Sequence, residues 1–216
     1  MSLTLYSHPF SSYSQKVLIA LYENGTPFTY RNLDEPAPNE ERQALWPFGK
    51  FPLLVDAGRT VAESSIIIEH LGLHHRGPVR FLPDDPVEAL EVRAMDRFFD
   101  LYVMSSMQKP VAEKLRPDGR PETARAEAAR ELDLAYAWLE EKLNGRTWAA
   151  GEAFSMADCA AAPSLFYADW VHQIGEQFPT VRAYRSRLLA RPSFARCVEE
   201  ARPYRGYFPL GAPDRD

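Results

Sequence analysis

Three serines near the start of the chain could hold an anion. They are Ser11, Ser12 and Ser14, and they directly precede a run of apolar residues. A helix that begins here would present unpaired backbone N–H groups and the positive end of its dipole at its first turn. A hydroxyl beside that end could donate a hydrogen bond to an anion such as a thiolate, which is the function that the pattern suggests for Ser11. The alternative is that one of the serines only caps the helix.

Two histidines have a spacing that metal sites on a helix can use, because His70 and His74 are four residues apart. No HExxH motif accompanies them and no acidic residue supplies a third ligand, so the sequence predicts a solvated pair and no metal. His8 is expected to be a turn residue. The two cysteines, Cys159 and Cys197, form neither a metal set nor a disulfide framework and are expected to be core thiols.

Composition excludes several functions. The chain has 216 residues, of which 45% are hydrophobic and 25% are charged, and its net charge is -5. These values are typical of a globular protein with a proper core, and the mild negative charge does not favour nucleic acid. No apolar run approaches the ~20 residues that a membrane helix needs, and the N-terminus lacks the pattern of a signal peptide. We therefore expect a cytoplasmic location.

The elements that position the serines form a small α/β unit. Leu3 and Leu5 alternate with polar or amphipathic residues, as in a strand with one buried face. The following helix has its buried stripe at Val17, Leu18, Leu21 and Tyr22. Further segments are a strand over 27–31, a helix over 39–45, strands over 49–56 and 59–62, and a helix over 63–74. The order is β-α-β-α-β-β-α, within residues 1–76.

The second half of the chain, residues 87–216, is expected to be all-helical and to follow a linker over about 77–86. Met95, Phe99 and Tyr102 mark one face of a long helix. Ser155-Met156-Ala157-Asp158 is a capping box, in which Ser and Asp side chains bind each other's backbone N–H. It predicts a helix start and gives Asp158 a structural role. The tail from Tyr204 is expected to be irregular.

These motifs, in this order, resemble those of the cytosolic glutathione transferase family. The matching segments are residues 11–17 (Ser-Ser-Tyr-Ser-Gln-Lys-Val), 51–54 (Phe-Pro-Leu-Leu), 63–64 (Glu-Ser) and 155–158 (Ser-Met-Ala-Asp). The resemblance implies a thioredoxin-like domain that binds glutathione, an all-helical C-terminal domain and a homodimer. The serine-rich start is similar to serine-type bacterial members, closest to the zeta and theta classes. The zeta pattern has a cysteine where this chain has Tyr13.

The resemblance also implies roles for particular residues. Ser11 would donate to the thiolate of glutathione, with Ser12 as the next choice and Tyr6 and Tyr13 as rivals. Such a bond is worth ~1.5–3 kcal/mol, most of the ~2.7 kcal/mol needed to lower the thiol pKa by ~2 units. A hydroxyl in this role is a donor and not a nucleophile.

Glutathione itself would bind at two further segments. A cis Phe51–Pro52 bond would present the Phe51 backbone to the cysteinyl part, whereas Pro52 in a trans bond would only start a strand. Ser64 and Glu63 suit the carboxylate and ammonium of the γ-glutamyl end, and otherwise complement a helix dipole. Lys50 could reach the glycine carboxylate or be a solvated loop lysine.

The implied function is a glutathione transferase of detoxification type that adds the thiolate to a small hydrophobic electrophile, with glutathione as co-substrate and no metal. Alternatives are an isomerase of the maleylacetoacetate type and a non-catalytic binding protein on the same fold, such as the stringent starvation proteins. A thiol–disulfide oxidoreductase is disfavoured because no cysteine precedes Cys159. Candidates for the electrophile wall are Phe98, Tyr102, Met104 and Met107, unless they belong to the core.

Overall fold

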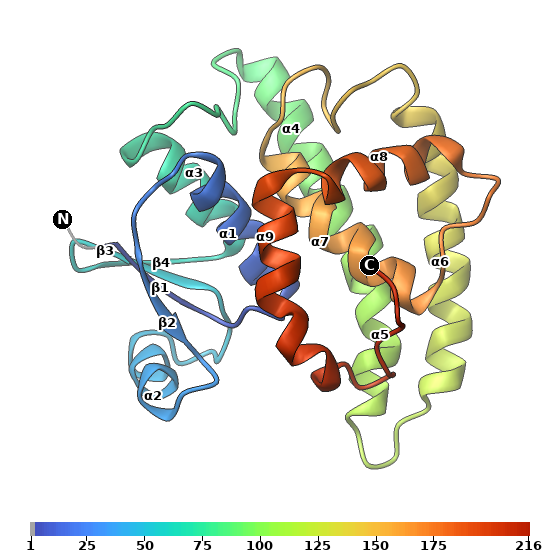
Figure 1. Cartoon of the computed structure of the whole chain (residues 1–216), viewed down its shortest axis with the longest axis horizontal. Coiled ribbons are helices and arrows are strands. Elements are labelled where there is room, and N and C mark those ends of the chain that lie inside the picture. Colours follow the sequence, from blue (N-terminus) through green and yellow to red (C-terminus); the bar gives the residue numbers. More distant parts are fainter. Residues whose placement is uncertain (1–2) are drawn as a thin grey trace.

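The computed structural model describes residues 3–216 and places a four-stranded sheet beside a helical domain (Figure 1). The strands are β1 (Leu3–Ser7), β2 (Thr29–Asn32), β3 (Leu53–Asp56) and β4 (Arg59–Ala62), in the order β2-β1-β3-β4. β1 and β2 are parallel, and the other pairs are antiparallel. The helices of this half are α1 (Ser12–Glu23), α2 (Pro36–Leu45) and α3 (Ser64–His74). The thioredoxin-like arrangement predicted from the sequence is confirmed.

Burial explains why these segments take these forms. Leu53 and Leu54 are consecutive in β3 and are both fully buried, so the sheet is covered on both faces there. The sequence predicted one buried stripe for α1, but the helix is buried from Ser14 to Leu21 on all sides. The reason is that α1 lies between the sheet and two helices of the other domain, α7 (Met156–Val171) and α9 (Pro192–Ala201).

The connection between β3 and β4 is the tight hairpin that the sequence predicted. Ala57 and Gly58 form its two-residue turn, with φ of 48° and 85°. A hairpin turn with positive φ at both central residues matches the right-handed twist of the strands that it joins. Asp56 is thereby fixed at the very end of β3.

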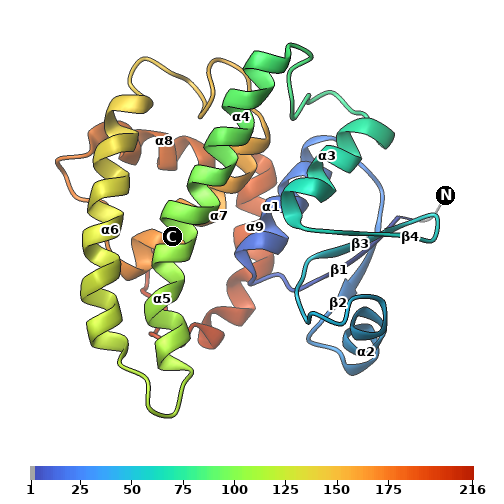
Figure 2. The same ribbon diagram turned by 180° about the vertical axis from the view of Figure 1, so that it is seen from behind.

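The C-terminal half is helical throughout its regular structure, as predicted (Figure 2). Besides α7 and α9 it contains α4 (Pro86–Phe98), a π-helix (Phe99–Met104), α5 (Ser105–Lys114), α6 (Pro121–Lys142), α8 (Pro179–Leu189) and a 3₁₀-helix (Arg202–Tyr207). α7 is buried along its whole length and forms the centre of this half. The capping box at its start is confirmed, because the Asp158 carboxylate accepts from the Ser155 N–H at 2.8 Å.

The long helix expected around Phe99 is interrupted by the π-helix, which corrects one buried position. Met95 and Phe99 are buried as predicted, but Tyr102 is 60% exposed and Val103 is buried instead. Met95, Phe99 and Val103 are each four residues apart, and because a π-helical turn holds more residues than an α-helical turn, the position three places after Phe99 falls short of the buried face. The structure therefore turns Tyr102 to the surface.

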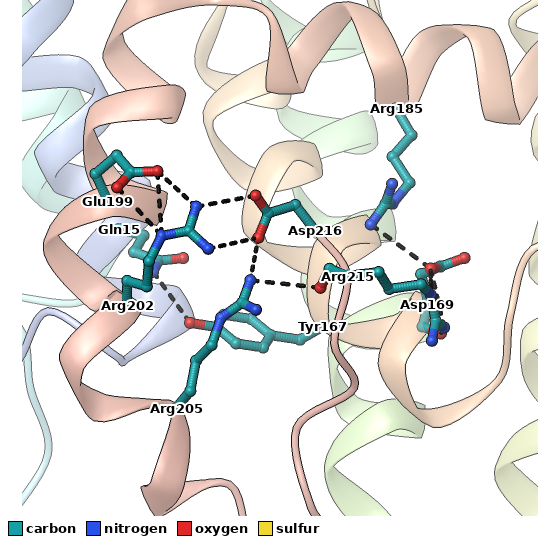
Figure 3. A network of polar contacts seen from close by, with 9 residues as sticks. All are labelled: Gln15, Tyr167, Asp169, Arg185, Glu199, Arg202, Arg205, Arg215 and Asp216. Atoms are coloured by element: carbon teal, nitrogen blue, oxygen red, sulfur yellow. Dashed lines mark hydrogen bonds and ion pairs between the residues drawn. The ribbon is translucent and has the colours of Figure 1, made fainter.

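The tail of the chain folds back over the helical half (Figure 3). Asp216 binds Arg202, with Oδ2 3.0 Å from Nη2, and also pairs with Arg205. Arg215 donates to the Asp169 carbonyl at 2.7 Å. The predicted irregular tail from Tyr204 thus begins as a 3₁₀ turn, and residues 208–216 are irregular.

Residues 75–85 lie between α3 and α4 and belong to neither. The division at 77–86 into domains 1–76 and 87–216 stays a prediction. Within residues 3–216, no helix combines the length and the apolar character that crossing a membrane requires.

Candidate functional site

A cleft of about 330 Å³ contains most of the residues that the sequence selected. This volume lies in the range of small-molecule sites. Its lining comes from α1, the loop before β3, the start of α3, and the α4–π-helix–α5 column: Tyr13, Trp46, Lys50, Phe51, Pro52, Glu63, Ser64, Ser65, Arg97, Asp100, Leu101 and Gln108. The structure therefore brings together the five predicted glutathione contacts, Lys50, Phe51, Pro52, Glu63 and Ser64.

The start of α3 presents a strained residue and free backbone donors to this cleft. Glu63 is the N-cap and has φ of 69°, a conformation that costs a non-glycine residue of order 1–3 kcal/mol. The first intrahelical bond is donated by Ile67 to the Glu63 carbonyl at 2.8 Å. The N–H groups of Ser64 and Ser65 precede it and have no partner within the helix, so they can bind a carboxylate.

The loop before β3 forms another wall. The Phe51–Pro52 peptide bond is cis, as the family resemblance implied. Pro52 is buried, whereas Lys50 and Phe51 are exposed, so the Lys50 ammonium lies at the solvent side of the cleft.

The two predicted catalytic serines lie at the start of α1 but are not among the residues that line the cleft. Ser11 is the N-cap of α1, and its Oγ accepts from the Ser14 N–H at 3.3 Å. The capping alternative is thus realised, yet the hydroxyl proton of Ser11 is not used in that bond. Ser12 is only 8% exposed.

Of the two rival tyrosines, Tyr13 lines the cleft and Tyr6 does not. Burial, together with the negative charges of Asp100 and Glu63, raises the pKa of Tyr13 to about 12. Its hydroxyl is therefore protonated at neutral pH and can donate a hydrogen bond. Tyr6 is a strand residue whose hydroxyl donates to Glu41 at 3.0 Å.

A buried lysine, which sequence reasoning missed as a site element, supports the cleft from behind. Lys16 is 1% exposed, and its Nζ lies 2.7 Å from Asp96 Oδ1 and 2.7 Å from Asp100 Oδ2. It also donates to Ser65 Oγ at 2.9 Å. This network ties α1 to α3, α4 and the π-helix. The signal in the sequence was a lysine inside an apolar helix together with two aspartates four residues apart.

Asp100 lines the cleft and has one carboxylate oxygen without a hydrogen-bond partner in the described part of the chain. Its side chain is almost buried, and among residues 3–216 nothing donates a hydrogen bond to Oδ1. Burial raises the pKa of Asp100 above its ordinary value, and the charge of Lys16 opposes this. A buried carboxylate oxygen without a partner fits an ammonium group. With Lys50 and Arg97 as cations, the cleft can hold a ligand with one ammonium and two carboxylates, which is the charge pattern of glutathione.

The predicted electrophile wall is divided between surface and core. Met104 and Met107 are 1% and 4% exposed and belong to the core. Phe98 and Tyr102 instead line a groove of about 530 Å³, where Phe98 stacks on Trp138 with ring centroids 4.3 Å apart. Leu101 lines both the groove and the cleft, so the two adjoin.

Two other sequence candidates are placed by the structure. His8 lies in the turn after β1, where its Nδ1 accepts from the Phe10 N–H at 3.1 Å. The thiols of Cys159 and Cys197 are buried and free, as expected, and burial raises the pKa of both.

A larger cleft, of about 590 Å³, lies between α3 and α4. Two of its three arginines are paired, Arg93 with Glu69 and Arg80 with Asp84, and these pairs use both of the carboxylates that line it. We therefore place the candidate site in the smaller cleft, where an acceptor is free.

Comparison with known proteins agrees with this geometry. Residues 5–79 match the N-terminal domain of glutathione S-transferases, and residues 98–192 match their C-terminal domain. The chain belongs to the glutathione S-transferase family. A solved glutathione S-transferase from Methylobacillus flagellatus with glutathione bound has a TM-score of 0.78 and 25% identity, over 91% of this chain and 98% of that one.

Other proteins that are similar to the chain have names that point to different roles. A stringent starvation protein A homolog of Coxiella burnetii is 29% identical over 92% of both chains. FtsZ-localized protein A of Caulobacter vibrioides is 30% identical over 88% of both. The structure of the beta-etherase LigF from Sphingobium has a TM-score of 0.74 and 26% identity, over 93% of this chain and all of that one. The zeta and theta resemblance stays a prediction.

Proposed function

We propose that the protein is a glutathione transferase that activates the thiol of glutathione and adds it to a small electrophile. The observation that carries this proposal is the unpartnered Asp100 oxygen in the same cleft as the free N–H groups of α3. Together they match the ammonium and carboxylate of an α-amino acid, which is the γ-glutamyl end of glutathione. Family membership and a glutathione-bound relative support the same ligand.

In this proposal each segment has one task. Ser64 and the backbone at the start of α3 bind the γ-glutamyl carboxylate, while Glu63 and Asp100 bind the ammonium. Phe51 and Pro52 hold the cysteinyl part, and Lys50 binds the glycine carboxylate. The sulfur then lies toward the start of α1, where the helix N-terminus and a hydroxyl favour the thiolate.

We assign the hydroxyl to Ser11, with Ser12 as the next choice, because its proton is free and the residue stands at the N-cap of α1. Ultraviolet difference spectra of bound glutathione across a pH series test this assignment, since the thiolate absorbs where the thiol does not. We expect the wild type to lower the thiol pKa by ~2 units and Ser11→Ala to return it toward ~8.5. Ser12→Ala is the matched neighbour and should leave the thiolate unchanged.

Tyr13 is the competing donor, because it is the hydroxyl residue of α1 that lines the cleft. If Tyr13→Phe abolishes the thiolate and Ser11→Ala does not, the tyrosine holds the sulfur and Ser11 is only a cap. If the wild type binds glutathione without forming a thiolate, the transferase proposal fails.

The electrophile is proposed to enter through the apolar groove of Phe98, Tyr102 and Trp138. A panel of aryl halides, β-aryl ethers and maleylacetoacetate-type isomerisation substrates would separate conjugation, ether cleavage and isomerisation. The name of the LigF relative makes the ethers a reasonable part of that panel. Tyr13, at the position of the zeta-class cysteine, makes isomerisation the weaker alternative.

A non-catalytic binding protein is the second candidate function. Relatives named for stringent starvation and for localisation with FtsZ favour it. A thermal melt with millimolar glutathione distinguishes the two, because a ligand that binds only the folded state must raise its stability. No shift would favour the binding protein. The cytoplasmic location and the detoxification role stay predictions.

A further inference from the structure

Asp56, His70 and His75 form a cluster on the α/β half that the glutathione site does not use. The Asp56 Oδ2 atom lies 2.9 Å from His70 Nε2 and 2.7 Å from His75 Nε2. One donor atom from each of the three residues lies within 4.8 Å of the other two. The side chains are mostly buried, with 11%, 10% and 22% of their surface exposed.

The sequence had suggested a different pair of histidines, His70 and His74, and no acidic residue as a third ligand. His70 and His74 have the helical spacing, but His74 is exposed and makes no contact with Asp56 that the structure records. His75 is the C-cap of α3 with φ of −131°, so the chain leaves the helix there. That departure brings its ring to the end of β3, where the hairpin turn fixes Asp56. The expectation that no acid accompanies these histidines was wrong.

We propose that Asp56, His70 and His75 bind a borderline transition-metal dication of the Zn²⁺ type. Two imidazoles and one carboxylate are a donor set that such ions prefer, whereas Mg²⁺ and Ca²⁺ prefer oxygen ligands. Tetrahedral ligands at ~2.0–2.1 Å from the metal lie about 3.3 Å apart. A metal that binds all three atoms therefore requires the Asp56 oxygen to move by roughly 0.5 Å from each nitrogen.

The fourth position belongs to water or to His74, whose ring centroid lies 4.5 Å from that of His70. The bound metal would join the C-terminal end of α3 to the β3–β4 hairpin. Ser64 begins α3 and His74 ends it, 11 residues that span roughly 16 Å. The metal site is thus separate from the glutathione cleft and has a structural role, so its test does not depend on the proposed function.

Isothermal titration of untagged, chelator-treated protein with ZnCl₂ tests the proposal. We expect one Zn²⁺ per chain with a micromolar or tighter dissociation constant, and no binding of MgCl₂. At a free zinc concentration of 100 times this constant, the melting temperature should rise by about 5–10 °C. Either no zinc binding by the wild type or an unchanged melting temperature at saturation would overturn the proposal.

Variants locate the site. His70→Gln and His75→Gln keep a hydrogen-bond donor toward Asp56 but remove the imidazole, and each should weaken zinc binding at least tenfold. His172→Gln is the matched control, because His172 also pairs with one carboxylate, that of Asp133 at 2.8 Å. The proposed site would be contradicted if the double variant His70→Gln/His75→Gln bound zinc as tightly as the wild type. It would also be contradicted if His172→Gln lost as much zinc affinity as His70→Gln or His75→Gln.

A measurement on the wild type alone covers the case in which a variant fails to fold. Anomalous diffraction at the zinc edge from zinc-soaked crystals should give a peak bounded by Asp56, His70 and His75. A zinc peak elsewhere and none here would overturn the assignment.

Discussion

At the scale of single residues, the site depends on polar groups whose partners are incomplete. Ser11 caps α1 and keeps its proton, and Asp100 keeps one free oxygen although it is almost buried. Unpaired buried groups are costly, so they are retained where a ligand completes them. Lys16 balances part of this cost, because its ammonium lies between the two aspartates.

Replacing Lys16 by methionine should destabilise the protein strongly. Asp100 would become a buried carboxylate without its cation, and within residues 3–216 Asp96 would keep only the Ser65 hydroxyl at 2.7 Å and Arg97 at 3.7 Å. Breaking a buried ion pair in this way costs about 3–5 kcal/mol. Urea unfolding followed by circular dichroism measures the loss. Lys109→Met is the control, because Lys109 binds Glu127 and Glu131 at the surface and such pairs contribute about 0–1 kcal/mol. Similar losses in both variants would show that burial does not decide the effect.

At the scale of elements, α3 and the π-helix determine the shape of the cleft. Glu63, in its strained conformation, lies at the start of α3 and lines the cleft. In the π-helix, Asp100 and Leu101 line the cleft while Tyr102 lines the groove. π-Helical turns are frequent at functional sites, because they change which side chains share a face. The residues that line the cleft therefore lie mainly at the ends of elements and in irregular turns, and the regular helices and strands fix their positions.

The start of α7 should be sensitive to Asp158 more than to Ser155. Ser155→Ala removes one capping contact and should cost about 1 kcal/mol. Asp158→Ala also removes two hydrogen bonds that the carboxylate accepts, from the Ala149 N–H at 2.8 Å and from the Tyr184 hydroxyl at 2.6 Å. Both donors would then be buried without a partner. Buried donors without a partner cost about 1–3 kcal/mol each, so we expect a loss of at least about 3 kcal/mol.

Asp85→Ala is the control for this comparison, because Asp85 is an exposed N-cap of α4. It should cost about 1 kcal/mol in the same denaturation experiment. A loss for Asp158→Ala that only equals this value would mean that its contacts beyond the cap contribute little.

The Arg93–Glu69 ion pair between α3 and α4 should make the free energy of unfolding depend on pH in the acidic range. The hydrogen bonds from Arg93 hold the pKa of Glu69 below its ordinary value. The pair therefore stabilises the folded state above pH ~4.3, the unfolded-state value, and this contribution is lost as pH falls through the lower folded-state pKa.

We expect Glu69→Gln to lower the free energy of unfolding by about 1 kcal/mol at pH 7 and by less at pH 3. Urea unfolding at both pH values measures the difference. Glu176→Gln is the control, because the Glu176 side chain is 96% exposed. A Glu69→Gln effect that is larger at pH 3 than at pH 7 would contradict the expected direction.

At the scale of the whole molecule, the two halves are joined by buried polar contacts. Gln15 of α1 donates to the Tyr167 hydroxyl of α7 at 3.0 Å (Figure 3). Tyr167 in turn donates to the Phe10 carbonyl at 3.2 Å. The 3₁₀ turn of the tail also packs on the loop before α1, where the His8 and Tyr204 rings are 4.7 Å apart. The loop that leads to Ser11 is therefore fixed by the helical half.

A homodimer, implied by the family resemblance, is testable through α3 and α4. Both helices expose large apolar side chains, among them Leu73 at 68% and Leu90 at 64%. We expect light scattering to give about twice the chain mass of 24.6 kDa, and the charged double variant Leu73→Glu/Leu90→Glu to give the single mass. Leu134→Glu, at an equally exposed leucine of α6, should leave the dimer intact. A wild-type protein that has the mass of a single chain would contradict the predicted homodimer.

The sequence by itself determined the β-α-β-α-β-β-α order of the first half and the capping box, and the family resemblance implied the segments that form the cleft. Alternation in β1 and the Ser155–Asp158 spacing are local signals, and local backbone physics is sufficient to interpret them. The tertiary structure alone decided which side chains meet. Lys16 looked like an ordinary helix residue until α3 and α4 enclosed it, and His75 replaced His74 because the chain leaves the helix at its C-cap. Contacts between distant segments follow from packing and have no local pattern, so only the folded chain shows them.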